Sequence, residues 1–536
     1  MNFFSFKYRQ ALCLSIFLSV FAITCLHARW TLIVYLAGDN SLDSAIAGEQ
    51  VLRDLNNLEL GIDTASVSAI VLADRRGGPP DGDGNTFVYD IRHDTVPHQF
   101  GDSSMSYGIA TSTKSVSLIM PSAGNDELNM GDPVNLIAFS TWTITEYPAD
   151  NYMLVLWNHG GGWYPKAPVF KKGIAWDDTS EDDFLSTEEL GTALKTIKEL
   201  LPAGKQIDII LFDACLMASV EVAYEIKDCA YYMVASEEKE SGFPYDDILK
   251  AISSNPGYDS RQLCQKIVDL FDVCYSTDSS LYSGTFSSRT ASAIELSKVS
   301  DLAVSIDVLA DMLISKISVP AFYNVIGSIR SGTEYFGTSE DDNEYYGCID
   351  IYDLADKIEN SNSFNYTDLK SAASSVKSAV KSCVFANKTG SDHPNSGGIS
   401  INFPLTSESW NERNNPDYNY ETLKFSQDTL WASFLGKYFS SPYIDSKTLF
   451  NVTTGPNPFI PSAGNVKILN FPANSDIKVK IYNLEGILVR KISGSGSYIE
   501  WDGKNSQGST VASGIYFYVA DTDNGTVKGK FTVINK

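Results

Sequence analysis

Residues 206–217 read Gln-Ile-Asp-Ile-Ile-Leu-Phe-Asp-Ala-Cys-Leu-Met, an apolar run that stops on an aspartate and a cysteine. A second run, residues 152–157, stops on Asn158 and His159, and glycines follow. Uninterrupted apolar runs of this length are typical of strands buried on both faces of a parallel sheet. Function in open α/β sheets collects beyond the carboxyl ends of such strands. We therefore expect the His159 imidazole and the Cys215 thiol at one edge of a sheet.

Strands and helices alternate around these two runs. Strands are expected at residues 30–37, 67–73, 86–91 and 231–236, and helices at residues 43–60, 133–147, 187–201 and 216–227. Ser186, with Glu189 three residues later, shows the capping-box pattern of a helix start. This alternation predicts an α/β fold, a mostly parallel sheet with helices on both faces.

The length of 536 residues indicates two or three domains beyond any leader. The expected division is a signal peptide at 1–28, a catalytic core at 29–257, a helical and β subdomain at 258–445 that completes it, and a C-terminal unit at 446–536. Short β-like runs separated by Asp-Gly and Asn-Gly turns fill the last unit. Their spacing predicts a small antiparallel β-sandwich.

The N-terminus indicates export. Lys7 and Arg9 precede an apolar stretch, residues 11–26, which ends at His27 and the small residue Ala28. This is the pattern of a secretory signal peptide, so the expected location is outside the cell or on its surface. No later stretch resembles a transmembrane segment.

The composition restricts the classes of partner that the protein is expected to bind. A formal net charge of -25 argues against a nucleic-acid partner, since phosphate binding needs a basic face. Such a protein attracts cationic substrates, although acidity often serves solubility alone. No CxxC pair occurs, which argues against a zinc knuckle.

His159 and Cys215 are 56 residues apart, near the interval of about 50 that separates the histidine and cysteine of caspases. A cysteine at the start of the helix expected from Leu216 would gain thiolate stabilisation from free backbone amides. His159 would act as base, and the Gly160 and Cys215 amides as an oxyanion hole. The ordinary alternatives are a buried apolar cysteine and a loop histidine. The residues alone leave this choice open.

Several motifs in the same order resemble the clostripain family of cysteine peptidases. They are WTLIVYLAGDN at 30–40, LWNHGGGW at 156–163, FDACLM at 212–217 and ASEE at 235–238, with GGISINFP at 397–404 similar to a later motif. The resemblance covers most of the chain before the expected sandwich. It implies a caspase-like fold and an endopeptidase.

The resemblance implies a dyad of His159 and Cys215 that cleaves protein or peptide substrates after Arg or Lys through an acyl-thioester. It also implies that Asp213 selects the basic side chain, where caspases have glutamine. The alternative is a structural aspartate that caps the following helix. Ser236 and Glu237, at the end of the next strand, are expected to form another wall of the substrate pocket.

The loop at 164–172 matches the place where clostripain relatives are cut during self-activation. Lys166, Lys171 and Lys172 are basic cleavage sites in a proline-broken segment, as proteolysis requires.

The chemistry itself needs no cofactor, but the resemblance implies calcium dependence. Acidic clusters at 177–183 and 340–344 offer the oxygen ligands that Ca²⁺ prefers. Neither fits an EF-hand loop, so solvated loops are the alternative and the metal ligands stay unassigned.

Residues 446–536 resemble FlgD-type immunoglobulin-like modules and sorting domains of secreted bacterial proteins, through GPNPF at 455–459 and ASGIYF at 512–517. This implies contact with the cell surface or the secretion machinery. Two rival functions remain: a non-catalytic surface or adhesion protein on a peptidase-like scaffold, and a sortase-like acyl transferase using the same thiol.

Overall fold

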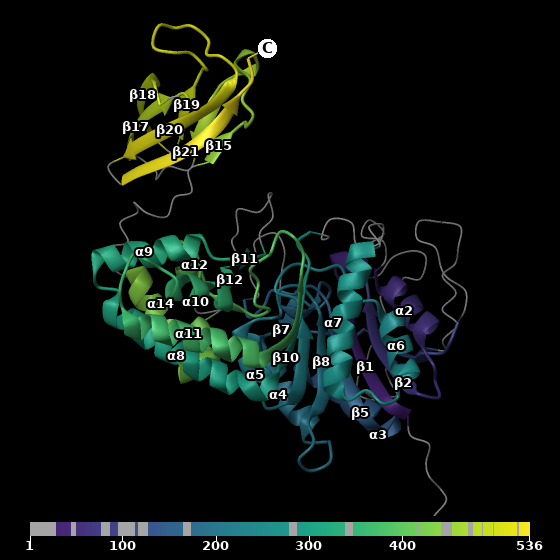
Figure 1. Ribbon diagram of the computed structural model, residues 1–536. Helices are drawn as coiled ribbons and strands as arrows, with labels where there is room; N and C mark the ends of the chain where they lie inside the picture. Colours follow the sequence, from purple (N-terminus) through teal and green to yellow (C-terminus); the bar gives the residue numbers. More distant parts are fainter. Residues whose placement is uncertain are drawn as a thin grey trace, which may run out of the picture. The chain divides into compact units, whose positions relative to one another are not determined.

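The computed structural model describes residues 28–43, 50–76, 86–94, 113–115, 127–164, 173–277, 287–337, 347–414, 419–440, 453–469, 475–484, 486–496, 498–522 and 525–535 (Figure 1). The chain forms two compact units, residues 1–301 with 380–400 and residues 302–379 with 401–536. The expected signal peptide, apart from Ala28, lies outside the described residues.

The first unit is built on a nine-stranded sheet of order β13-β10-β9-β8-β5-β1-β2-β3-β4. Its strands are β1 (Ala28–Gly38), β2 (Val67–Arg75), β3 (Phe87–Asp90), β4 (Thr113–Ser115), β5 (Ala149–Trp157), β8 (Ile207–Asp213), β9 (Ala230–Ala235), β10 (Thr290–Glu295) and β13 (Val384–Thr389). The five strands from β9 to β2 are parallel, and antiparallel strands continue the sheet on both sides. The predicted mostly parallel sheet is confirmed.

The register brings the strand ends of interest to one edge. Trp157, the last residue of β5, lies opposite Asp213, the last residue of β8. On the other side of β5, Trp157 lies opposite Leu36 of β1. The residues that follow these strands therefore leave the sheet at the same level.

Helices cover both faces of this sheet (Figure 1). One layer holds α2 (Gln50–Gly61), α6 (Tyr245–Ser254) and α7 (Ser260–Thr277), and the other holds α3 (Pro133–Glu146), α4 (Thr187–Lys198) and α5 (Val220–Ile226). Leu32 and Val34 of β1 share one core with Leu55 and Phe271. Tyr35 points the other way and contacts the Phe139 ring on α3. Both faces of β1 are thus buried, as its unbroken apolar sequence predicts.

Two expected helix starts differ from the structure. The helix expected from Leu216 begins only at Val220, where the Ser219 side chain caps it. The Leu216 and Ala218 amides bond instead to the Glu238 and Ser236 carbonyls. Leu216 also has a φ of 66°, which is incompatible with a helix. The backbone here is held by the end of β9, so Cys215 does not stand at a helix N-terminus.

The other difference concerns the segment after β1. The helix expected from Asp43 is described from Gln50 onward, and Ser41–Asp43 form a 3₁₀ turn, η1. The capping box at Ser186 and Glu189 is present as predicted.

The second unit contains α9 (Pro320–Ser331), α10 (Ile351–Glu359), α12 (Ser407–Glu412), α13 (Lys424–Asp428) and α14 (Trp431–Ser440), with a small sheet of β11 (Tyr335–Phe336), β12 (Cys348–Asp350) and β14 (Ser400–Asn402). Two long helices, α8 (Val299–Lys316) and α11 (Thr367–Cys383), run through the points where the units divide. Among the residues the model describes, no helix is both long and apolar enough to cross a bilayer.

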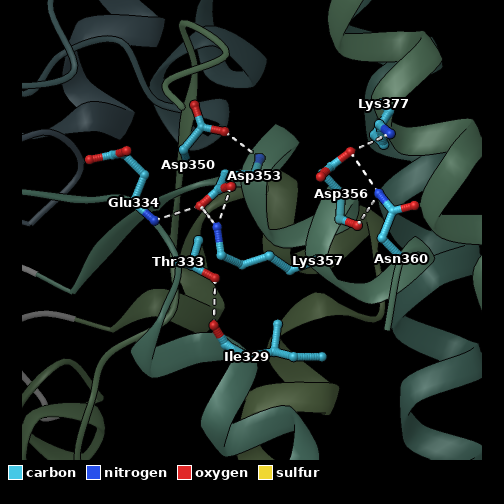
Figure 2. Close-up of polar contacts among 9 residues, drawn as sticks. All are labelled: Ile329, Thr333, Glu334, Asp350, Asp353, Asp356, Lys357, Asn360 and Lys377. Carbon is cyan, nitrogen blue, oxygen red and sulfur yellow. Dashed lines mark hydrogen bonds and ion pairs between the residues drawn. The ribbon is translucent and has the colours of Figure 1, made fainter. Parts of the chain in front are cut away.

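A polar network holds the start of α10 (Figure 2). Asp350 caps the helix by accepting the Asp353 amide at 2.6 Å. The buried Asp353 carboxylate accepts the Glu334 amide at 2.8 Å and pairs with Lys357 one turn later. No reactive thiol or imidazole belongs to the residues drawn, and we interpret the network as structural.

The C-terminal residues form two antiparallel sheets. One holds β15 (Thr453–Gly455), β16 (Val466–Leu469) and β19 (Tyr498–Trp501), and the other holds β17 (Ser475–Tyr482), β18 (Leu488–Gly496), β20 (Gly514–Thr522) and β21 (Gly525–Val533). Trp501 from the first sheet and Phe531 from the second meet in one core, with ring centroids 5.4 Å apart. The predicted β-sandwich is confirmed.

Candidate active site

His159 follows the end of β5, and its chain is fastened to β8. The Asn158 amide donates to the Asp213 carbonyl at 3.2 Å, which extends the pairing of the two strands by one residue. The half-buried His159 ring meets Ser41, whose Oγ lies 2.9 Å from Nε2. The imidazole is therefore held between the ends of β1 and β5.

Gly160 brings the histidine segment directly onto the cysteine segment. A Cβ added at Gly160 would lie 2.0 Å from the Cys215 carbonyl oxygen and 2.6 Å from the Cys215 nitrogen. Such contacts are impossible for any residue with a side chain, so only glycine fits here. The structure thus brings together the two segments predicted from sequence.

The Cys215 thiol lies against the backbone of Glu240. The Glu240 amide is 3.5 Å from the sulfur, and the sulfur is 3.7 Å from the Glu240 carbonyl oxygen. Cys215 is half-buried, whereas Cys229, Cys264, Cys348 and Cys383 are buried. Among the described residues, the six cysteines after the expected signal peptide, Cys274 included, form no disulfide bond. The Cys215 thiol is thus not sealed within the core.

Three carboxyl groups and one guanidinium gather around Asp213 and residues 240–242, next in the chain to the thiol and to the backbone that it contacts. Tyr245 donates to the buried Asp213 carboxylate at 2.5 Å. Arg53 pairs with Asp54 at 3.0 Å and donates to the Ser241 carbonyl. A Cβ on Gly242 would lie 2.9 Å from the Arg53 guanidinium and 4.0 Å from Asp213 Oδ1. We call Asp54, Asp213 and Glu240 the Asp213 cluster.

Two members of the Asp213 cluster, Asp213 and Glu240, have raised carboxyl pKa values. Burial raises the pKa of Asp213 well above its usual range, and the charges of Glu240 and Asp54 raise it further. Burial likewise raises the pKa of Glu240 to about 7. The Arg53 charge lowers both pKa values but does not offset these effects. The Asp213 cluster has more carboxyl groups than the one neighbouring guanidinium can neutralise.

Ser236 and Glu237 are buried at the end of β9. The Ser236 hydroxyl lies 2.9 Å from the Thr290 hydroxyl and donates to the Glu238 carbonyl at 2.8 Å. Glu237 accepts a hydrogen bond from Ser396. These side chains brace the segment whose backbone contacts residues 215–218. The expected processing residues Lys166, Lys171 and Lys172 lie outside the described residues.

A second cluster of carboxylates lies near the His159 segment. Asp39 follows β1, Asp74 belongs to the end of β2, Glu127 precedes α3, and Asp177 ends β6 (Ile174–Asp177), which pairs with β7 (Asp183–Leu185). One oxygen of each lies within 4.8 Å of the others. We call these four residues the acidic quartet.

The acidic quartet has oxygens that no protein group satisfies. Asp39 Oδ1, Asp74 Oδ2 and Glu127 Oε2 are buried without a hydrogen-bond partner. Among the described residues, no lysine or arginine pairs with any of the four. Burial and mutual repulsion raise the pKa of Asp74 well above its usual range, and burial raises that of Glu127 to about 7. A cation bound among these oxygens would offset their mutual repulsion.

Calcium fits this donor set. Ca²⁺ binds oxygen ligands at about 2.3–2.6 Å, so ligands on opposite sides of the ion lie about 4.8 Å apart. Four hard carboxylates within that span can supply half or more of its coordination. The acidic quartet is therefore a candidate cation site.

Of the quartet, sequence analysis singled out only Asp177, whose cluster had solvated loops as the alternative. Asp177 is fully buried, so that alternative is wrong for this residue. The signal for Asp39 and Asp74 was present, since each ends a long apolar run. The second expected cluster, at 340–344, lies outside the described residues.

A thiol and an imidazole at the carboxyl edge of a mostly parallel sheet are the arrangement expected of a cysteine peptidase. The model of the Clostripain family matches residues 34–438. The chain belongs to this family and is a cysteine peptidase.

Individual proteins and solved structures are similar to this chain to different degrees. Clostripain of Hathewaya histolytica is 26% identical over 411 residues, which cover 70% of this chain and 74% of that protein. The structure of a secreted C11 cysteine protease from Bacteroides thetaiotaomicron, in complex with an irreversible peptide inhibitor, aligns with a TM-score of 0.50 and 19% identity over 76% of this chain and 99% of that one. FlgD from P. aeruginosa matches weakly, with a TM-score of 0.11 and 29% identity over 13% of this chain and 57% of its own.

Proposed function

We propose that the protein is a secreted or cell-surface endopeptidase that cleaves after Arg or Lys, with His159 as base and Cys215 as nucleophile. The observation that carries this proposal is the contact of Gly160 with the Cys215 peptide. It joins the segment of a half-buried imidazole to the segment of a half-buried thiol. The Asp213 cluster, which includes the residue whose backbone contacts the thiol, supports a preference for a basic substrate side chain.

In the proposed reaction, His159 takes the thiol proton and the Cys215 sulfur attacks the substrate carbonyl carbon. The Gly160 and Cys215 amides stabilise the oxyanion that forms. The intermediate collapses to an acyl-thioester as the leaving amine takes the proton from His159. A water molecule, deprotonated by His159, then releases the acid and restores the thiol. No cofactor enters these steps.

The charge of the cluster supports Asp213 as the residue that selects a basic substrate side chain. We propose that Ser236 and Glu237 contribute another wall of the substrate pocket. When its carboxyl groups are ionised, the Asp213 cluster carries more negative charge than the Arg53 guanidinium can offset. An Arg or Lys side chain would neutralise this excess, and a neutral one would not. The alternative of a helix cap is weakened, because α5 begins at Val220 and Ser219 caps it.

The KM for an Arg peptide is expected to rise up to about 10-fold as the pH falls from 8 to 6. The Glu240 carboxyl, with its pKa raised to about 7, is ionised above that pH and becomes neutral below it. The attraction for a cationic side chain is therefore lost on acidification. Steady-state kinetics measure this. In Glu240→Gln the KM should change less over the same range, and an identical rise in that variant would assign the effect to another group.

Processing is expected in the loop at 164–172. Fresh protein should yield two fragments nicked near Lys166, Lys171 or Lys172, while Cys215→Ala stays intact because the cut is made by the enzyme itself. Electrophoresis and N-terminal sequencing detect the nick. A protein that stays intact and is nonetheless active would contradict self-activation by cleavage in this loop.

We further propose Ca²⁺ as a structural ion in the acidic quartet, and residues 446–536 as a module for surface retention or sorting. The sandwich contains no described thiol or imidazole, which supports a binding role over a catalytic one.

A fluorogenic peptide ending in Arg or Lys tests the proposal. Release of the fluorophore that depends on Cys215 supports the endopeptidase and excludes a non-catalytic adhesion protein. An added amine distinguishes the sortase-like alternative, because a transferase would give the amide product in place of the free acid.

A further inference from the structure

The acidic quartet and the catalytic histidine meet in one turn. Asp39, Asn40 and Ser41 follow β1 directly. Asp39 contributes its carboxylate to the quartet, and Ser41 Oγ lies 2.9 Å from His159 Nε2. One residue therefore separates the candidate cation site from the contact with the imidazole.

The turn and the histidine segment are anchored to the same carbonyl groups. The buried Asn40 side chain donates to the Ala37 carbonyl at 2.9 Å and the Trp176 carbonyl at 3.4 Å. The buried Asn158 side chain donates to the same two oxygens, at 2.6 and 3.0 Å. Asn40 precedes Ser41, Asn158 precedes the histidine, and Trp176 precedes a quartet member. The two sites thus share a backbone frame.

The carboxylates at the quartet end of this frame are only partly hydrogen-bonded. Asp39 Oδ2 accepts the Thr179 amide at 3.0 Å, and the Asp39 carbonyl accepts the Asp178 amide at 2.8 Å. Asp39 Oδ1 and Asp74 Oδ2, both buried, have no hydrogen-bond partner. Neighbouring ionised carboxylates repel one another, and a cation bound among them would offset this repulsion and hold the Asp39 side chain in place.

We propose that a divalent cation in the acidic quartet fixes the turn at residues 39–41, and that Ser41 thereby holds His159 by Nε2, so that Nδ1 exchanges the proton with the Cys215 thiol. This rests on the proposed roles of His159 and Cys215. A hydrogen bond at one ring nitrogen sets the tautomer and orientation of the other. Ser41 is a positioning residue, and the cation does not touch the substrate.

The test compares full-length Ser41→Ala, Ser41→Thr and Asp74→Asn with the unaltered protein, in EDTA and in Ca²⁺ or Mg²⁺. Asp178→Asn is the matched control, an acid next to the quartet but outside it. Ca²⁺ binding is measured by calorimetry and by the shift in Tm. Orientation of the imidazole is measured as the rate of Cys215 alkylation by iodoacetamide at fixed pH, quantified by mass spectrometry, because the thiolate is the reactive form.

In the unaltered protein, Ca²⁺ should raise Tm and speed Cys215 alkylation by about 10- to 100-fold, the range expected for a misplaced catalytic group. Asp74→Asn should lose both responses, and Asp178→Asn should keep both. Ser41→Ala should keep the Tm shift but lose the alkylation response, with kcat lowered and KM little changed. Ser41→Thr should restore the response.

An alkylation response to Ca²⁺ in Ser41→Ala equal to that of the unaltered protein would overturn the proposal. So would a protein that binds neither Ca²⁺ nor Mg²⁺. Calorimetry, Tm and alkylation need no peptide turnover. Failure of this proposal can therefore be distinguished from failure of the proposed peptidase function. A protein that shows the whole alkylation pattern but cleaves no Arg or Lys peptide contradicts the proposed function and supports the coupling.

Discussion

Cys215→Ala is expected to lower kcat/KM for an Arg-ended peptide by about 10⁴-fold, the loss typical when a nucleophile is removed and only binding and oxyanion stabilisation remain. The half-buried thiol contacts the Glu240 backbone. Removing the sulfur leaves the peptide carbonyl without an attacking group. Release of a fluorophore from the peptide measures the loss, and Tm checks that the fold is kept.

Cys274→Ala is the matched control, because Cys274 is also half-buried but lies on α7. Its activity should stay within about 2-fold of the unaltered protein, as expected for a substitution outside the proposed dyad. Activity retained in Cys215→Ala, or lost equally in both variants, contradicts Cys215 as the nucleophile.

Asp213→Asn should reduce the preference for arginine over citrulline at the cleaved position by about 10³-fold, since a site built for a charged partner rejects the neutral analogue strongly. Citrulline has nearly the shape of arginine but no charge, so the ratio isolates the carboxylate. Asparagine retains an oxygen that can accept the Tyr245 hydroxyl. The fold should therefore survive, and kcat/KM for the citrulline peptide should change little.

Asp208→Asn provides the control on the same strand. Asp208 lies near the start of β8, where it accepts the Tyr152 amide and the Ser260 hydroxyl. This variant should lower Tm without changing the ratio of arginine to citrulline cleavage. If Asp213→Asn slows both peptides equally, its role is structural and the selector lies elsewhere.

Local sequence predicted the central strands because burial on both faces demands unbroken apolar runs, as in β1 and β8. The capping box at Ser186 was also local, since both partners lie within one turn. The helix start at Leu216 was wrong because the amides of that segment bond to the end of β9, a tertiary contact invisible to a local pattern. Only after Ser219 does the chain meet helical requirements.

The candidate dyad was predictable because two scarce reactive residues each ended an apolar run. The sequence did not predict the acidic quartet as a unit, because its members come from segments around positions 39, 74, 127 and 177 and meet only after folding. Nor did it predict Ser41, an exposed serine of an ordinary type whose meaning comes from one contact with His159.

The order of apolar runs and polar stops determined by itself that a mostly parallel sheet would carry a histidine and a cysteine at its carboxyl edge. The tertiary structure alone decided that Gly160 lies against the Cys215 peptide and that Cys215 does not stand at a helix N-terminus. It also decided that four carboxylates gather around one point near the His159 segment. The physical reason is the separation of the interacting residues along the chain. Local periodicity indicates which faces of a strand or helix are buried, whereas unpaired charges and close backbone contacts depend on which distant strands become neighbours.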